Sequence, residues 1–201
     1  MHPPENIHCL ALNYPGVGSN DAETPLYFVK SKQAYCESGA QVRFPSGVKE
    51  VWTEVELGIV IARDGCDIPP ADAEAFIAGY VVCADISCEN IYGRDHHLAF
   101  SKSRAGFCPC SGVVIPLPLK QAMQLEMTTE INGRVTQTGN TRGMLLSPAD
   151  TVAYLSTLTS LAAGDLILTG TPPGYQYNML KRGDSVRHRI AAIGEVFYDL
   201  V

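Results

Sequence analysis

The chain has 201 residues, of which 46% are hydrophobic and 18% charged, so it can bury a sizeable core as a single domain over residues 1–201. Its net charge of −6, with no block of Lys or Arg, excludes nucleic acid and an anionic membrane as main partners. No apolar run reaches the roughly 18 residues of a membrane span, and the first residues lack a signal-peptide pattern. We therefore expect a cytoplasmic protein.

Short apolar runs separated by Gly, Pro and Asn predict a β-rich architecture. Seven cysteines are scattered among these runs, an odd number in a chain without a secretory signal. A disulfide framework is therefore not expected, and most of the thiols are predicted to be buried as small hydrophobic side chains.

The apolar run over residues 52–60 is typical of a strand, and it opens with Glu54 and Glu56. Side chains on a strand alternate between its faces, so both carboxylates point to the same side. Like charges at that spacing repel unless a proton, a basic group or a metal cation lies between them. For the pair alone, an exposed acidic strand start is an equally good interpretation.

A short helix is predicted over residues 70–78, followed by a buried strand over 79–87 that carries Asp85. A carboxylate in such a run needs a partner, because burying an unpaired charge is strongly unfavourable. Together with Glu54 and Glu56 it offers an all-oxygen donor set, which hard Mg²⁺, Mn²⁺ or Ca²⁺ prefers. Capping of a turn at the strand end is the alternative role for Asp85.

The second half of the chain predicts a hairpin and the longest helix. Residues 125–131 alternate as in a strand, and Asn132-Gly133 is a strong hairpin turn. Ser147 as cap, a proline at the first helical position and an acid in the first turn mark a helix start, and Gly164 is the predicted stop. The strand over 165–168 then leads into a turn rich in Gly and Pro that is no phosphate-binding Walker motif.

At this point the sequence resembles the fumarylacetoacetate hydrolase superfamily. Members carry Glu-x-Glu on one strand and an Asp about thirty residues on, the pattern of Glu54, Glu56 and Asp85. Further agreement lies in residues 11–14, 101–109, 131–141 and 164–174, so the resemblance spans nearly the whole chain. It implies an α+β fold, a β-rich mixed-sheet roll with a few short helices, and pairing as a homodimer.

The resemblance also implies a site that binds Mg²⁺ or Mn²⁺ through the three carboxylates and takes a small oxo acid as substrate. It places Lys102 with Glu54 in the catalytic machinery, although position alone makes Lys102 an ordinary solvated lysine. The residues expected to bind substrate or line the pocket are Thr171, Gly170, Gln137, Tyr14, Arg142 and Lys30. The reaction expected is breakage of a C–C or C–H bond of a 2-oxo acid through an enolate.

The chain departs from the hydrolytic members at the expected lid and at residues 88–90, where relatives often carry an arginine and this chain has none. Those members follow the Asn-Tyr motif with a histidine and a glutamate that activate water on a mobile lid, whereas residues 15–23 here contain no histidine. Residues 78–80, 104–109 and 130–134 look most like the isomerase and decarboxylase branch of homoprotocatechuate breakdown. The favoured activity is therefore isomerisation or decarboxylation of unsaturated 2-oxo or 2-hydroxy di- and tricarboxylates, of the 5-carboxymethyl-2-hydroxymuconate isomerase or 5-oxopent-3-ene-1,2,5-tricarboxylate decarboxylase type.

Two alternatives stay open. The chain is a C–C hydrolase of acylpyruvates or related 1,3-diketo acids if His96, His97 or a water replaces the missing base. It is a catalytically silent partner subunit if the departure reflects degeneration. Retention of all three carboxylates argues against degeneration, because clustered acids repel once their cation is gone.

Overall fold

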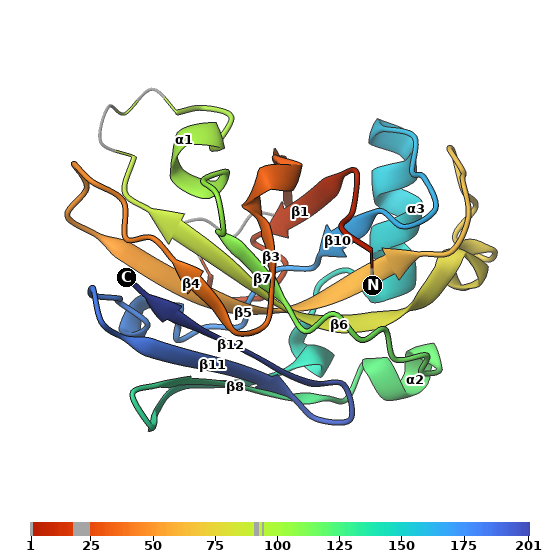
Figure 1. The fold of residues 1–201 in the computed structure, drawn as a ribbon. Coiled ribbons are helices and arrows are strands. Elements are labelled where there is room, and N and C mark those ends of the chain that lie inside the picture. The colour runs from red at the N-terminus through yellow and green to blue at the C-terminus, as the bar shows by residue number, and fades with distance from the viewer. Residues whose placement is uncertain (1, 18–24, 91–92, 94) are drawn as a thin grey trace.

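The structure is a computed structural model that describes residues 2–17, 25–90, 93 and 95–201 (Figure 1). The larger of its two sheets has the strand order β2 (Leu26–Lys30), β1 (Ile7–Ala11), β10 (Leu166–Leu168), β5 (Val51–Ile61), β6 (Ile77–Cys88), β7 (Cys108–Cys110), β3 (Tyr35–Glu37). The smaller sheet has the order β4 (Ala40–Val42), β12 (Gly194–Leu200), β11 (Ser185–Ile190), β8 (Glu126–Ile131), β9 (Arg134–Asn140). Both sheets mix parallel and antiparallel pairs.

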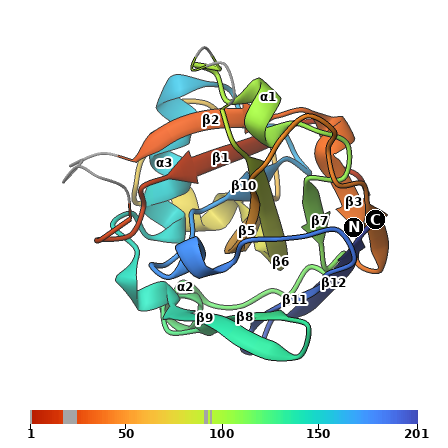
Figure 2. The ribbon, with the colours of Figure 1, turned by 90° about the vertical axis from the view of Figure 1, so that its left-hand side faces the viewer.

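The helices are few and short. They are α1 (Ala99–Lys102), α2 (Leu119–Ala122) and α3 (Pro148–Leu158), with 3-10 turns η1 (Lys32–Ala34), η2 (Ala73–Phe76), η3 (Thr141–Gly143) and η4 (Tyr175–Tyr177). Figure 2 shows the larger sheet curling above the smaller one, with α3 on the far side of β1 and β10. The predicted mixed-sheet roll is therefore confirmed. Among the described helices, none is long and apolar enough to cross a bilayer.

The two central strands, β5 and β6, hold the architecture together. They pair antiparallel over 11 and 12 residues, and nearly every position is buried, so both faces of the pair contact core. Leu57 and Val82 belong to a cluster shared with α3, whereas Val51 and Val81 belong to a second cluster shared with β11 and β12. Burial on both faces explains why these strands appear in the sequence as continuous apolar runs.

The hairpin prediction is confirmed, and two helix predictions need correction. Asn132 and Gly133 take φ values of 52° and 78° between β8 and β9, as the two-residue turn requires. The helix that starts at Ser147 ends at Leu158 rather than at Gly164, because the following chain turns extended and Leu161 exchanges backbone hydrogen bonds with Gly65.

The helix predicted over 70–78 shrinks to the 3-10 turn η2. Ile77 already starts β6, and the Phe76 carbonyl accepts a hydrogen bond of 2.8 Å from the Ala62 amide. The cysteine prediction is confirmed: all seven thiols are free, and five of them are buried.

We expect the Ser147→Ala variant to lose about 1 kcal/mol of unfolding free energy, because it removes the cap of α3. Ser147 and Asp150 form a capping box, with the Ser147 hydroxyl donating to Asp150 Oδ2 at 2.6 Å. Urea denaturation measures the loss. The Ser147→Asp variant, which keeps an acceptor at the cap, serves as control, and an equal loss in both variants would show that the cap is not the cause.

Candidate active site

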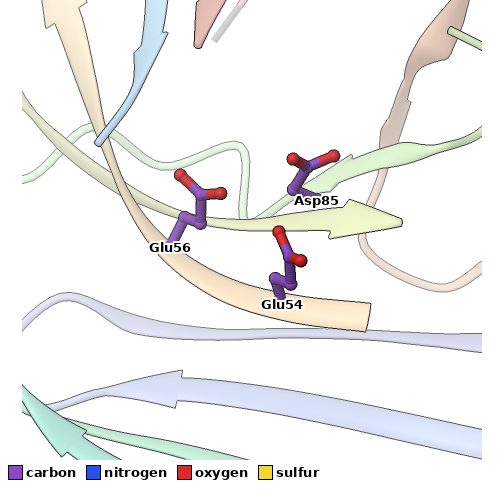
Figure 3. Close-up of side chains that lie close together, drawn as sticks. All are labelled: Glu54, Glu56 and Asp85. Atoms are coloured by element: carbon purple, nitrogen blue, oxygen red, sulfur yellow. The ribbon is translucent and has the colours of Figure 1, made fainter. Parts of the chain in front are cut away.

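Three carboxylates lie close together near one end of the central strand pair. Glu54 and Glu56 lie on β5, and Asp85 lies on β6 directly opposite Glu54 in the antiparallel register. All three side chains point into the same space, as Figure 3 shows, and one oxygen from each lies within 4.8 Å of the others. The alternation of the strand explains why residues 54 and 56 share a face.

Two buried lysines face this cluster. The Lys102 ammonium, at the end of α1, lies 2.5 Å from Asp85 Oδ2 and 3.2 Å from Glu54 Oε2. The Lys30 ammonium, at the end of β2, contacts the other oxygen of Asp85 and donates to the Ile86 carbonyl at 3.2 Å. Three acidic groups thus face two basic ones, so the cluster favours a further cation.

The surroundings shift the pKa values of the three carboxyl groups and of Lys102. Burial raises the pKa of Glu54, and burial together with the neighbouring carboxylates raises the pKa of Glu56 more strongly. Burial also opposes ionisation of Asp85, but the ammonium groups of Lys102 and Lys30 outweigh it and hold the pKa of Asp85 below its ordinary value. Burial would lower the pKa of Lys102, and the facing carboxylates raise it instead. Asp85 is therefore a carboxylate, and Lys102 an ammonium, at neutral pH.

A glycine turn after β10 holds Glu56 in place. The Gly170 amide donates a short hydrogen bond to Glu56 Oε2, and Gly170 has a φ of 89°. A side chain at this position would approach the Leu10 carbonyl within 3.2 Å, so only glycine fits without strain. Asn13 fixes the turn from outside, because its side-chain amide donates to the Thr169 carbonyl at 2.8 Å.

The carboxylates open into a cavity of about 160 Å³. Lys102 and the predicted substrate-binding residues Thr171 and Gly170 line it beside the acids, and apolar side chains such as Leu12 and Trp52 form much of the remaining wall. The Trp52 indole also donates to Glu54 Oε1 at 2.9 Å. Polar chemistry is thus confined to one end of a small, largely apolar space.

The structure places two predicted pocket residues outside this cavity. Tyr14 and Arg142 line a separate groove of about 690 Å³ along β8 and β9. The Tyr14 hydroxyl lies 3.5 Å from the Met127 sulfur, so this residue packs in the core between the two spaces. Lys30, which the sequence ranked with them, instead contacts Asp85 directly.

The histidines considered as a replacement base do not reach the acids. His96 and His97 are exposed, and neither lines the cavity. The lid segment, in which a histidine was found to be missing, lies partly in residues 18–24, outside the described residues. Within the described wall of the cavity, no side chain is a histidine.

A buried polar network behind the cavity was not foreseen from the sequence, apart from Gln137. The Gln137 side-chain amide, on β9, donates to Thr171 Oγ1 at 3.2 Å. Its carbonyl oxygen accepts from Asn178 Nδ2 at 2.7 Å and from the Thr129 hydroxyl at 3.0 Å. His188 on β11 continues the network to Thr53. Period two offered a signal for Thr53, because it points away from Glu54 on the same strand.

Fold and site together define a class of β-rich enzymes whose candidate centre is a cluster of carboxylates near one end of the central strand pair. The chain belongs to the fumarylacetoacetate hydrolase family: the family model described as "Fumarylacetoacetate (FAA) hydrolase C-terminal" matches residues 6–201. The family predicted from the motifs is therefore confirmed.

The similar proteins include a tautomerase, an isomerase and a hydrolase. The mitochondrial oxaloacetate tautomerase FAHD1 of Rattus norvegicus is 30% identical over 197 residues, which cover 94% of this chain and 88% of the relative. The crystal structure of 5-carboxymethyl-2-hydroxymuconate delta-isomerase from Mycobacterium smegmatis has a TM-score of 0.89 at 29% identity, covering 99% of this chain and 79% of that one. A fumarylpyruvate hydrolase from Pseudomonas aeruginosa, solved in complex with Mn²⁺ and pyruvate, has a TM-score of 0.85 at 27% identity, covering 99% and 90%.

We expect the Lys30→Met variant to lose about 3 kcal/mol of unfolding free energy in the absence of metal, because it removes one partner of a buried ion pair. Lys32→Met is the matched control: its ion pair with Glu5 spans 2.8 Å but is exposed, so the loss should stay below about 1 kcal/mol. Chemical denaturation in the presence of a chelator measures both. Equal losses would mean that Lys30 does not stabilise the carboxylate cluster.

We expect the unfolding free energy to decrease as the pH is lowered, because His188 is buried in its neutral form. Burial lowers the pKa of His188 from 6.5 to about 3, so the unfolded state binds its proton first. This contribution is complete above about pH 6.5 and is lost as the pH falls toward 3, at about 1.4 kcal/mol per unit. Between pH 7 and 5 the wild type should therefore lose about 2 kcal/mol more than the non-titrating His188→Asn variant. Parallel pH profiles of unfolding free energy for the two proteins would contradict this.

Proposed function

We propose that the protein is a divalent-metal-dependent enzyme that isomerises or decarboxylates unsaturated 2-oxo or 2-hydroxy acids by way of an enolate. The observation that carries the proposal is the meeting of Glu54, Glu56 and Asp85 beside the buried Lys102 ammonium in one small cavity. Such a set serves catalysis better than stability, since replacing buried charges by apolar side chains is often neutral or stabilising.

The donor set suits Mg²⁺ or Mn²⁺. Glu54, Glu56 and Asp85 would hold the ion, because three carboxylate oxygens are hard donors and the two lysines leave acidic charge unmatched. When bound, the ion supplies a Lewis acid that favours removal of a proton or carboxylate next to a keto group. The Mn²⁺ complex of the related fumarylpyruvate hydrolase supports this assignment.

The chain's own groups supply binding and charge. The Lys102 ammonium stabilises negative charge on a substrate oxygen at the acidic end of the cavity. The Thr171 hydroxyl and the turn that contains Gly170 bind the substrate carboxylate. The apolar wall that includes Leu12 excludes water, which strengthens these polar contacts.

Proton transfer and decarboxylation fit the cavity better than hydrolysis. Hydrolysis needs a group that activates water, and the described wall contains no histidine for that task. The isomerase from Mycobacterium smegmatis and the tautomerase relatives support the same choice.

Tautomerisation of a small 2-oxo acid such as oxaloacetate is a second candidate, and the cavity volume of about 160 Å³ favours it. Hydrolysis of acylpyruvates is the third, supported by the fumarylpyruvate hydrolase neighbour. All three reactions share the enolate and differ in the fate of the proton or the C–C bond.

An absorbance assay on metal-free protein, with and without added Mg²⁺ or Mn²⁺, tests the proposal. The substrates are 5-carboxymethyl-2-hydroxymuconate and its decarboxylation precursor, oxaloacetate, and acetylpyruvate. We expect metal-dependent turnover of the muconate, its precursor or oxaloacetate. The Glu56→Gln variant should lose activity by at least about 100-fold, because mutating a residue that only supports a metal ligand already lowers activity by about 10- to 100-fold. Glu37→Gln, which changes an exposed glutamate on β3, is the matched control.

Each outcome distinguishes the candidates. Turnover of acetylpyruvate alone would show a hydrolase, with water activated by a group outside the described wall. Mn²⁺ binding without any turnover would support a silent partner subunit. If calorimetry shows that Mn²⁺ does not bind, the protein is not a metal-dependent enzyme. The cytoplasmic location and the homodimer are separate predictions that this experiment does not address.

A further inference from the structure

A continuous chain of buried side-chain hydrogen bonds runs from the strand of the carboxylates to the wall of the cavity. It starts at Thr53, the neighbour of Glu54 on β5, and ends at Thr171, which lines the cavity. The members between them lie on β11, β8 and β9: His188, Thr129 and Gln137. All five side chains are at most 6% exposed, so water cannot replace a missing partner.

The direction of these hydrogen bonds is fixed at the end near the cavity. The Pro172 carbonyl can only accept, and it lies 2.7 Å from one end of the Gln137 amide. That end is therefore the NH₂ group, which also donates to Thr171 Oγ1 at 3.2 Å. The other end is the carbonyl oxygen, and it accepts from Asn178 Nδ2 at 2.7 Å.

The same reasoning assigns the hydrogens farther along the chain. The Thr129 hydroxyl lies 3.0 Å from the Gln137 carbonyl oxygen, so it donates its hydrogen there. Thr129 must then accept from His188 Nδ1, also at 3.0 Å, which places the ring hydrogen on Nδ1.

The remaining ring nitrogen then has to accept. His188 Nε2 lies 2.8 Å from the Thr53 hydroxyl, which in turn accepts from the Tyr198 hydroxyl at 2.6 Å. All ring partners are hydroxyl groups, and burial lowers the pKa of His188, so the imidazole is neutral at physiological pH. Every hydrogen in the chain thus has one consistent position.

The consequence appears at Thr171. Because Thr171 Oγ1 receives a hydrogen from Gln137, the hydroxyl keeps its own hydrogen for another acceptor. In the described part of the chain, this hydroxyl donates to no protein group. Thr171 lines the cavity together with Lys102, so the donor is available to an anionic ligand at the acidic end.

We propose that His188 and Thr129 are positioning residues that act with the Pro172 carbonyl and the Asn178 amide to hold the Gln137 amide in one orientation, so that Thr171 donates its hydroxyl hydrogen to the carboxylate of a bound 2-oxo acid. The inference rests on the proposed function, because it assumes an anionic ligand in the cavity. If His188 carried its hydrogen on Nε2, Thr129 would donate to Nδ1 instead, and its lone pairs would face the Gln137 carbonyl oxygen. The Gln137 carbonyl oxygen would then lose one of the two groups that donate hydrogen bonds to it, and only Asn178 would remain.

The first experiment reads the histidine tautomer directly and needs no substrate. Protein with ¹⁵N-labelled histidine is examined by NMR at pH 7, and the His188→Asn variant identifies the resonances of His188 among the five histidines. We expect the neutral tautomer with hydrogen on Nδ1. A hydrogen on Nε2 would overturn the proposal, whatever reaction the enzyme catalyses.

The second experiment is a double-mutant cycle on binding of pyruvate to the Mn²⁺-loaded protein, measured by calorimetry. Thr171→Val should weaken binding about tenfold, as expected for loss of a hydrogen bond to a charged group. Thr129→Val should weaken it about three- to tenfold, and Thr129→Ser, which keeps the hydroxyl, should stay within about twofold of the wild type. Adding Thr129→Val to Thr171→Val should cause no further loss, because both changes act through one hydroxyl.

A purely structural role of Thr129 would give a different pattern. The effects of Thr129→Val and Thr171→Val would then multiply, or Thr129→Val would lower stability without changing pyruvate affinity, and either result would overturn the positioning role. If the wild-type protein loaded with Mn²⁺ fails to bind pyruvate, the proposed function fails. In that case the tautomer measurement still decides the arrangement of hydrogens.

Discussion

The ion pairing around Asp85 is the constraint on which the rest of the site depends. Asp85 is 1% exposed near one end of a buried strand pair, where an unpaired carboxylate would be strongly destabilising. Lys30 and Lys102 reach it from β2 and α1, two segments far apart in the sequence. The carboxylate of Asp85 is therefore paired only when β2 has assembled near β6 and α1 has folded over the same strand.

The central strands serve two purposes at once. On most of their length both faces are apolar and pack into the two core clusters. Near one end of the pair, Glu54, Glu56 and Asp85 interrupt that pattern on one face, while Thr53 continues a polar contact on the other. The rigid core thus positions acidic groups without any loop between them and the body of the protein, which favours precise geometry.

Much of this could be predicted from the sequence, and the failures have physical reasons. Period two placed Glu54 and Glu56 on one face, and the turn and capping signals located the β8–β9 hairpin and the start of α3. Local patterns could not show where α3 ends, because the chain after Leu158 turns away to bond with Gly65, nearly a hundred residues earlier. For the same reason, local patterns could not show that Lys30 pairs with Asp85, or that Tyr14 lies outside the cavity. The role of His188 depends on Thr129 and Thr53, which only the packing of the two sheets brings together.

The fastening of the glycine turn by Asn13 has a consequence for how the protein is made. The side-chain amide of Asn13 and the carbonyl of Thr169 are separated by 156 residues, and the Gly170 amide meets Glu56 across 114. Contacts of such separation close late, since the loop entropy is lost before they form. A chain that emerges from the ribosome with its N-terminus first therefore has no complete acidic centre until Gly170 has been synthesised. A nascent chain that ends before Gly170 contains the three carboxylates but lacks the backbone amide that orients Glu56.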